Sequence, residues 1–144
     1  MINYIVYGHT SYLDILRIQT DYVTILDNTT LFINKNGEDM DDVLSKYDRV
    51  IYYDDSKPYA SRLIDCLNQI DDGYFLLIHD IDILLNVDES NIKVLQDFMV
   101  SSDVDRIDLK QTHNLNSTEI INVDGIDDVQ LVKQEQPSDF IYNV

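Results

Sequence analysis

The segment of residues 74–82 constrains the fold of this chain more than any other part of the sequence. Five consecutive apolar or aromatic residues, 74–78, follow the turn sequence Asp71-Asp72-Gly73. A run of this length is too short for an ordinary helix and is typical of a strand that is buried on both faces in the middle of a parallel sheet. Two carboxylates, Asp80 and Asp82, end the segment. Open α/β sheets bind their ligands at this carboxyl edge, so we interpret the two aspartates as the site.

Strand-like and helix-like segments alternate through residue 110. Periodicity and turn residues predict helices over residues 12–18, 39–47 and 58–70, the first capped by Thr10 or Ser11, and a fourth helix capped by Ser90-Asn91. Strands are expected over residues 3–7, 22–26, 31–34, 49–53, 74–78 and 104–110, and two further short strands over 119–123 and 129–132. The alternation predicts an α/β fold, a Rossmann-like and mostly parallel sheet with helices on both faces. At this length we expect one domain over residues 1–144.

The chain is strongly acidic. It carries 27 Asp and Glu residues against 10 Lys and Arg residues, which gives a formal charge of −17 at pH 7. This charge argues against broad contact with nucleic acid or with an anionic membrane. An anionic ligand would therefore need a metal ion or a well-placed arginine beside it.

No membrane span is expected, because no apolar run approaches about 20 residues, and the amino terminus lacks the pattern of a signal peptide. We therefore expect a soluble, cytoplasmic protein. The single cysteine, Cys66, excludes an internal disulfide and a thiolate metal site. The P-loop pattern, the Gly-x-Gly-x-x-Gly fingerprint and the His-Glu-x-x-His motif are also missing from the sequence.

Two segments carry a family resemblance. They are residues 52–63, YYDDSKPYASRL, and residues 78–82, IHDID, which end in the motif Asp80-Ile81-Asp82. Together they resemble the nucleotide-sugar half of GT-A glycosyltransferases, which carry an Asp-x-Asp motif, and in particular small viral and bacterial enzymes of this type. The resemblance covers roughly residues 1–112. It implies transfer of a sugar from a nucleotide-diphosphate sugar to an acceptor, an unknown glycan or other molecule.

The resemblance also implies a metal-dependent site. Asp80 and Asp82 would bind Mn²⁺ or Mg²⁺, hard cations that take carboxylate and phosphate oxygens together, although either aspartate could instead reach the ribose. The metal would then stabilise the departing diphosphate. The candidate nucleotide-sugar-binding residues are Gly8, His9, Thr10, Asp54, Asp55, Arg62 and Asp80. The sequence assigns no catalytic residue, and it does not say whether the anomeric configuration is retained or inverted.

Other functions stay open at this stage. An acidic, non-catalytic interaction module would explain the charge without any ligand site. A haloacid-dehalogenase-like phosphatase also uses Asp-x-Asp after a strand, but it needs that strand near the chain start and a threonine where this sequence has Leu84. The site residues have structural interpretations too, with the aspartates in a solvated loop and Arg62 in a surface ion pair.

Few residues follow Lys110, in the region where enzymes of the resembled type place the acceptor site and the catalytic base. Asp108, Asp124 and Asp139 are available carboxylates there, but nothing around them selects one as a base. We therefore expect these residues to be the donor-binding part of a larger catalytic unit, completed by a carboxyl-terminal domain or a partner subunit.

Overall fold

The structure is a computed structural model, and it describes residues 3–23, 28–37, 39–71, 73–80, 88–103, 107, 119–122 and 130–133. The chain forms two compact units, Met1–Asn86 and Val87–Val144. Each unit is described by itself below, and the single domain expected over residues 1–144 stays a prediction.

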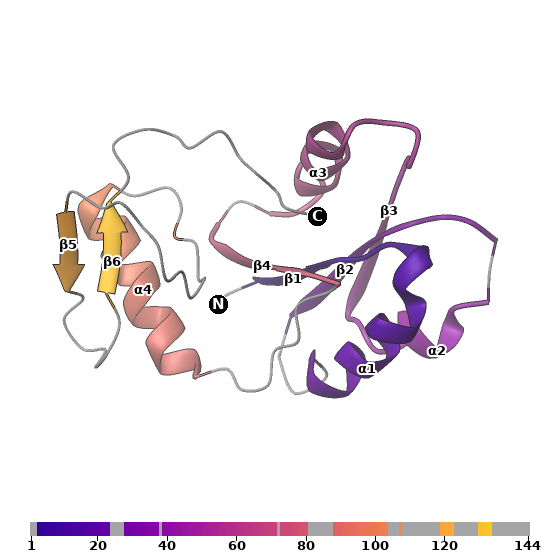
Figure 1. Ribbon diagram of the computed structural model, residues 1–144, viewed down its shortest axis with the longest axis horizontal. Coiled ribbons are helices and arrows are strands. Elements are labelled where there is room, and N and C mark those ends of the chain that lie inside the picture. The colour runs from indigo at the N-terminus through magenta and orange to yellow at the C-terminus, as the bar shows by residue number, and fades with distance from the viewer. Residues whose placement is uncertain are drawn as a thin grey trace. The chain divides into compact units, whose positions relative to one another are not determined.

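The first unit is built on a four-stranded sheet in which every pairing is parallel. Its strands are β1 (Asn3–Tyr7), β2 (Thr29–Asn34), β3 (Arg49–Tyr53) and β4 (Phe75–His79), in the spatial order β3-β2-β1-β4 (Figure 1). Parallel neighbours need crossover connections, and these contain the helices α1 (Leu13–Val23), α2 (Asp41–Leu44) and α3 (Tyr59–Leu67). The predicted α/β fold with a parallel sheet is therefore confirmed.

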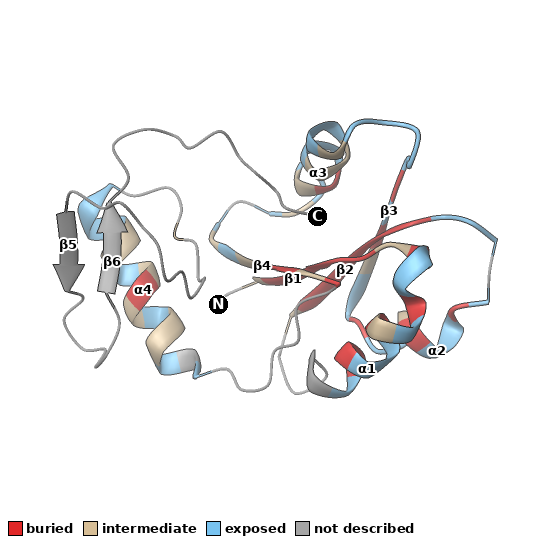
Figure 2. Cartoon of the chain, viewed as in Figure 1, coloured by how far each residue is buried: buried red, intermediate tan, exposed pale blue. Residues whose placement is uncertain are grey.

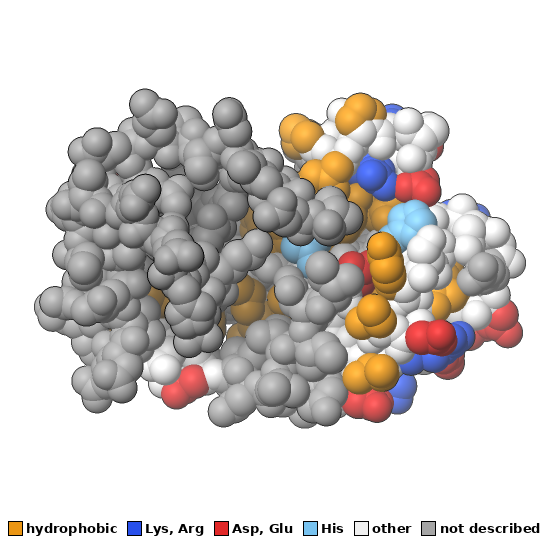
Figure 3. Space-filling model, viewed as in Figure 1, with side chains coloured by type: hydrophobic (Ala, Val, Ile, Leu, Met, Phe, Trp, Pro, Cys, Tyr) orange, Lys and Arg blue, Asp and Glu red, His pale blue; other side chains and the backbone are white. Residues whose placement is uncertain are grey.

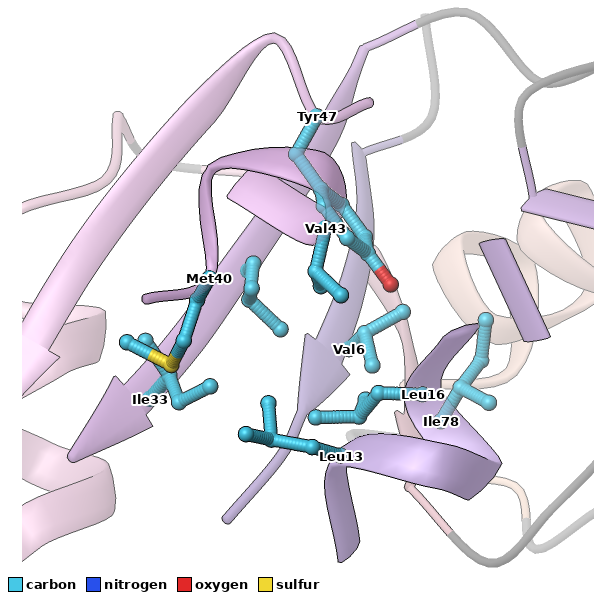
Figure 4. Packing of buried hydrophobic residues seen from close by; sticks show 9 residues of the cluster. Val6, Leu13, Leu16, Ile33, Met40, Val43, Tyr47 and Ile78 are labelled. Atoms are coloured by element: carbon cyan, nitrogen blue, oxygen red, sulfur yellow. The ribbon is translucent and has the colours of Figure 1, made fainter. Parts of the chain in front are cut away.

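Side chains alternate between the two faces of the sheet, so the core has two layers. One layer joins the strands to α1 and α2, and its buried members are Val6, Leu13, Leu16, Leu31, Ile33, Met40, Val43, Tyr47 and Ile78 (Figure 4). The other layer joins the strands to α3, and its buried members are Ile5, Tyr7, Phe32, Ile51, Tyr53 and Cys66. Burial is deepest along β1 and β2, which lie in the middle of the sheet (Figure 2).

The strand order reverses at β1. The first two crossovers step from β1 to β2 and from β2 to β3, whereas the third returns from β3 to the other side of β1, where β4 lies. Crossovers between parallel strands are right-handed, so the reversal places α3 on the opposite face from α1 and α2. Ligands of open α/β sheets bind beyond the carboxyl ends of the strands at such a reversal. In this sheet the reversal lies between β1 and β4.

β4 lies at the edge of the described sheet, so the prediction of a central, doubly buried strand over residues 74–78 is wrong for this sheet. Ile78 is its only buried residue, and Phe75 is 41% exposed. β1 and β2 hold the central positions instead. The number of apolar residues in a run does not tell how many strands flank it, and this is the physical reason for the error.

Three local predictions also need correction. Tyr22 and Val23, expected in a strand, belong to the end of α1, and residues 24–26 lie outside the described part of the chain. A 3₁₀ turn, η1 (Thr10–Tyr12), precedes α1, and the ring of His9 caps it in place of Thr10 or Ser11. The fourth helix, α4 (Glu89–Ser102), is capped by the carboxylate of Asp88 and not by Ser90-Asn91. In the two capping corrections the observed cap precedes the predicted one: His9 lies before Thr10, and Asp88 lies before Ser90.

The second unit contains α4 and a two-stranded antiparallel sheet. Leu95 of α4 is buried against Val94, Phe98 and Ile107. Strands β5 (Glu119–Asn122) and β6 (Gln130–Lys133) pair with each other, which confirms the two short strands expected there. Of the strand expected over residues 104–110, only Ile107 is described, and it lies outside any strand. Within the described ranges, no helix has the length and apolar character needed to cross a membrane.

Leu16 and Ile18 test the packing of α1, because they lie on opposite faces of the same helix. Leu16 is fully buried, whereas Ile18 is 52% exposed. We expect Leu16→Ala to lower the free energy of unfolding by about 2–5 kcal/mol, because it leaves a cavity, and Ile18→Ala to change it by about 0.5 kcal/mol or less. Urea titration followed by circular dichroism measures both values. Equal losses would show that α1 does not pack on the sheet as described.

Candidate functional site at the carboxyl edge of the sheet

Most of the sequence-predicted site residues follow strands of the parallel sheet, so they lie at the same carboxyl edge. Gly8, His9 and Thr10 follow β1, Asp54 and Asp55 follow β3, and Asp80 follows β4, while Arg62 lies on α3. Figure 3 shows histidine, basic and acidic side chains gathered on the described part of one face. The hydrogen bonds below establish which of these residues the fold joins and which it leaves apart.

The loop after β1 is tied to both neighbouring strands. The backbone N–H of Gly8 donates to the carbonyl of Phe32 in β2 at 2.8 Å, and the N–H of His9 donates to Oδ2 of Asp80 at 2.9 Å. A Cβ on Gly8 would lie 3.0 Å from both Cδ atoms of Leu16, so a larger residue here would have to displace the buried Leu16 side chain by a few tenths of an ångström. The loop therefore packs tightly between α1 and the ends of β2 and β4.

The next three N–H groups of the loop are also bonded to the protein. The N–H of Thr10 donates to Oδ1 of Asn34 at 2.8 Å, and Nδ2 of Asn34 donates to Oγ1 of Thr10 at 2.9 Å. Ser11 donates its N–H to Nδ1 of His9, and Tyr12 donates its N–H to the carbonyl of His9. Every backbone N–H from residue 8 to residue 12 thus has an acceptor within the protein. This loop does not offer the row of open amides with which glycine-rich loops hold phosphate.

Asp80 is a structural part of this edge. It is 7% exposed, its N–H donates to the carbonyl of Tyr7 at 3.0 Å, and its carboxylate accepts the N–H of His9 at the start of the η1–α1 helix. A helix start favours an anion through its N–H groups and its dipole. The carboxylate of Asp80 therefore lies at a helix start after the first strand, the kind of place where dinucleotide-binding sheets hold phosphate.

His9, Asp55 and Arg62 form a chain of polar contacts across the edge. Because Nδ1 of His9 accepts the N–H of Ser11, the neutral ring carries its proton on Nε2, which donates to Oδ2 of Asp55 at 3.0 Å. The other carboxylate oxygen of Asp55 accepts Nη1–H of Arg62. Arg62 thus forms an ion pair with Asp55, as one interpretation of the sequence expected. Its side chain is only 18% exposed, however, so it is not a typical surface residue. Its Nε is buried and has no hydrogen-bond partner among the described residues.

Tyr7 and Tyr53 form a tyrosine cluster beneath these polar contacts, on the α3 face of the sheet. Tyr53 stacks on Tyr7 with ring centroids 5.0 Å apart, and the guanidinium of Arg62 lies over the Tyr53 ring at 5.2 Å. The hydroxyl of Tyr53 donates to the carbonyl of Gly8 at 2.8 Å, which joins the end of β3 to the loop after β1. Burial raises the pKa of both hydroxyls, so both tyrosines are neutral over the physiological range. Tyr53 therefore supports both the loop and Arg62.

Asp54 is not joined to the other site residues. Its Oδ1 accepts the hydroxyl of Ser56 at 2.7 Å and the N–H of Ser56 at 3.0 Å, which closes a local turn. These bonds hold the pKa of the Asp54 carboxyl below its ordinary value. The role predicted for Asp54 in the site is therefore not supported by its contacts, because the side chain turns back on its own loop.

The predicted metal pair is described only in part. Asp82 lies outside the described residues. Within the described ranges, no three His, Cys, Asp or Glu side chains come together as a metal-binding group. A carboxylate has about four acceptor positions, so the bond from His9 does not by itself prevent Asp80 from binding a cation. Of the two predicted metal ligands, the described residues include Asp80 alone. The binding of Mn²⁺ or Mg²⁺ by Asp80 and Asp82 therefore stays a prediction.

Three residues of this edge were not identified from the sequence, namely Asn34, Tyr53 and Gln19. Asn34 is a polar residue that ends a predicted strand, which is the same signal that identified Asp80. Gln19 lies three residues after Leu16 on the apolar face of α1, where a polar residue indicates a buried hydrogen bond. Tyr53 gave no such signal, because a tyrosine at a strand end is ordinary core.

Comparison with known proteins gives no relative for this chain: no protein-family model, no curated protein and no solved structure matches it.

Removal of the Asp80 carboxylate tests its role in holding the loop. Asp80→Ala leaves the partly buried N–H of His9 without its acceptor, so we expect a loss of about 1–3 kcal/mol in the free energy of unfolding. Asp80→Asn keeps an oxygen acceptor and should lose less. The control is Asp54→Ala at the same edge, where exposed local bonds make the expected loss smaller than about 1 kcal/mol. Chemical denaturation measures all three, and a neutral Asp80→Ala would contradict the structural role.

Proposed function

We propose that the carboxyl edge of this sheet binds the diphosphate of a nucleotide-diphosphate sugar through Mn²⁺ or Mg²⁺, and that the chain acts as a metal-dependent glycosyltransferase. One observation supports this proposal most: the loop after β1 has no open N–H group between residues 8 and 12, and the carboxylate of Asp80 already lies at the helix start. A diphosphate at this edge has to be neutralised by cations, not by the backbone.

The charge of the chain leads to the same requirement. With a formal charge of −17, the protein repels free anions, and the edge itself contains the carboxylates of Asp55 and Asp80. A divalent cation bridges carboxylate and phosphate oxygens and turns this repulsion into binding. Asp80 and Asp82 would hold that cation, which supplies charge stabilisation for the departing diphosphate.

Arg62 is a cation held in place at this edge. Its guanidinium is oriented by stacking over Tyr53 and by the bond to Asp55, and its buried Nε is still unpaired among the described residues. Arginine matches the oxygens of phosphate with its planar set of N–H groups. In this proposal Arg62 would contact the diphosphate, and the loop of Gly8, His9 and Thr10 would line the nucleotide site.

The first test is metal-dependent binding. We expect the wild-type chain to bind a nucleoside diphosphate, such as UDP or GDP, at least tenfold more tightly with Mn²⁺ than with EDTA, and Asp82→Asn to remove that enhancement. Asp21→Asn, which removes one exposed carboxylate from α1, is the charge-matched control. Isothermal titration calorimetry measures the affinities. A metal enhancement that persists unchanged in Asp82→Asn would place the site elsewhere, and metal-independent binding would favour an interaction module.

The second test concerns Arg62. If its guanidinium contacts the diphosphate, Arg62→Ala should weaken UDP or GDP binding at least tenfold, about 1.4 kcal/mol, and leave the affinity for the corresponding nucleoside nearly unchanged. Arg49→Ala is the control, because Arg49 is exposed at the opposite end of β3. The same calorimetry applies. An equal loss for nucleotide and nucleoside would mean that Arg62 only supports the shape of the edge.

A further inference from the structure

Gln19 is a fully buried amide in the layer between α1 and the sheet. A buried amide is costly unless it is hydrogen-bonded, so its partner identifies what the fold gains from it. Nε2 of Gln19 donates to the carbonyl of His79 at 3.0 Å. His79 is the last residue of β4 and directly precedes Asp80. The bond therefore connects α1 to the point where the chain leaves the sheet and enters the predicted metal pair.

This bond is one of several contacts that hold the end of β4. The N–H of Asp80 donates to Tyr7 in β1, and the carboxylate of Asp80 accepts the N–H of His9 in the loop after β1. Both of these contacts are made by β1 or by the loop that follows it. Two helices also contact His79: the hydroxyl of Tyr59 in α3 lies 3.4 Å from Nε2 of its ring, whereas Gln19 of α1 bonds to its backbone carbonyl. The bond from Gln19 is therefore the one of these two that holds the backbone leading into Asp80.

We propose that Gln19 is a positioning residue of the nucleotide site, acting through His79 to orient Asp80. This inference rests on the proposed function, which supplies the ligand. The hydrogen bond between Gln19 and His79 does not depend on that proposal. A peptide plane that rotates at His79 changes the direction of the Asp80 carboxylate. A metal ligand has to be held within a fraction of an ångström of its productive position, so this rotation weakens cation binding.

The test compares two isosteric variants on the same helix. Gln19→Met keeps the length of the side chain and removes the N–H donor. Thr20→Val is the matched control, because Thr20 is also buried, but its hydroxyl donates to Arg17 within α1 at 2.7 Å and makes no bond to β4. We expect Gln19→Met to lower the Mn²⁺-dependent affinity for UDP or GDP at least tenfold and Thr20→Val to leave it within twofold of wild type.

Amide hydrogen exchange by NMR provides a measurement that needs no ligand. In Gln19→Met we expect the amides of His9 and Asp80 to exchange at least tenfold faster, relative to the amide of Asp48, which bonds to Thr29 at the other end of the sheet. Thr20→Val should leave these ratios unchanged. In the wild-type chain, the side-chain amide signal of Gln19 should shift when Mg²⁺ and UDP are added together, which tests the coupling without any substitution.

The outcomes separate the two proposals. If the wild-type chain binds no nucleoside diphosphate, the proposed function fails, and the exchange ratios alone decide whether Gln19 holds the end of β4. If nucleotide binds but Gln19→Met keeps full affinity and unchanged ratios, the positioning role is wrong. Equal effects of Thr20→Val and Gln19→Met would also overturn it, because they would reflect general loosening of α1.

Discussion

The need to pair every buried backbone N–H organises this structure. The chain passes from β1 into α1 through a tight loop, and the first N–H groups of a helix have no partners within the helix. Here Asp80, Asn34 and the ring of His9 supply the missing acceptors. The loop consequently depends on the ends of β2 and β4, and the edge where ligands of such sheets bind is preorganised by the protein's own side chains.

Much of the fold could be predicted from the sequence. The bounds of β1 and β3 agree with the predicted strands, because turn residues mark their carboxyl ends, and the alternation of helix and strand indicated parallel pairing. The position of β4 could not be predicted, because strand order depends on the side to which α3 returns the chain. Tyr22 and Val23 were misassigned because two aromatic or β-branched residues carry strand propensity locally, whereas continuation of α1 depends on tertiary packing.

The candidate site was predictable where residues follow strands. Parallel strands end at one edge, so the approach of the loop after β1 to Asp80 follows from topology alone. Contacts between particular side chains did not follow in this way. Asp54 and Asp55 are neighbours in the sequence, yet one closes its own turn and the other links His9 to Arg62. That difference depends on the direction of the chain after β3. Asp82 lies outside the described residues, so the paired-carboxylate hypothesis stands as it did from the sequence.

The reactivity of Cys66 can report whether α3 is packed on the sheet. Cys66 is the chain's one cysteine, it is the buried residue of α3 that packs on the sheet, and burial raises the pKa of its thiol to about 11. The thiolate is the reactive form, so at neutral pH a thiol reagent reaches this sulfur only when α3 separates from the sheet. The labelling rate therefore records local opening of the helix that carries Arg62, separately from global unfolding. A ligand that engages Arg62 would slow that opening, so occupancy of the edge becomes visible as protection of one sulfur atom, without any engineered label.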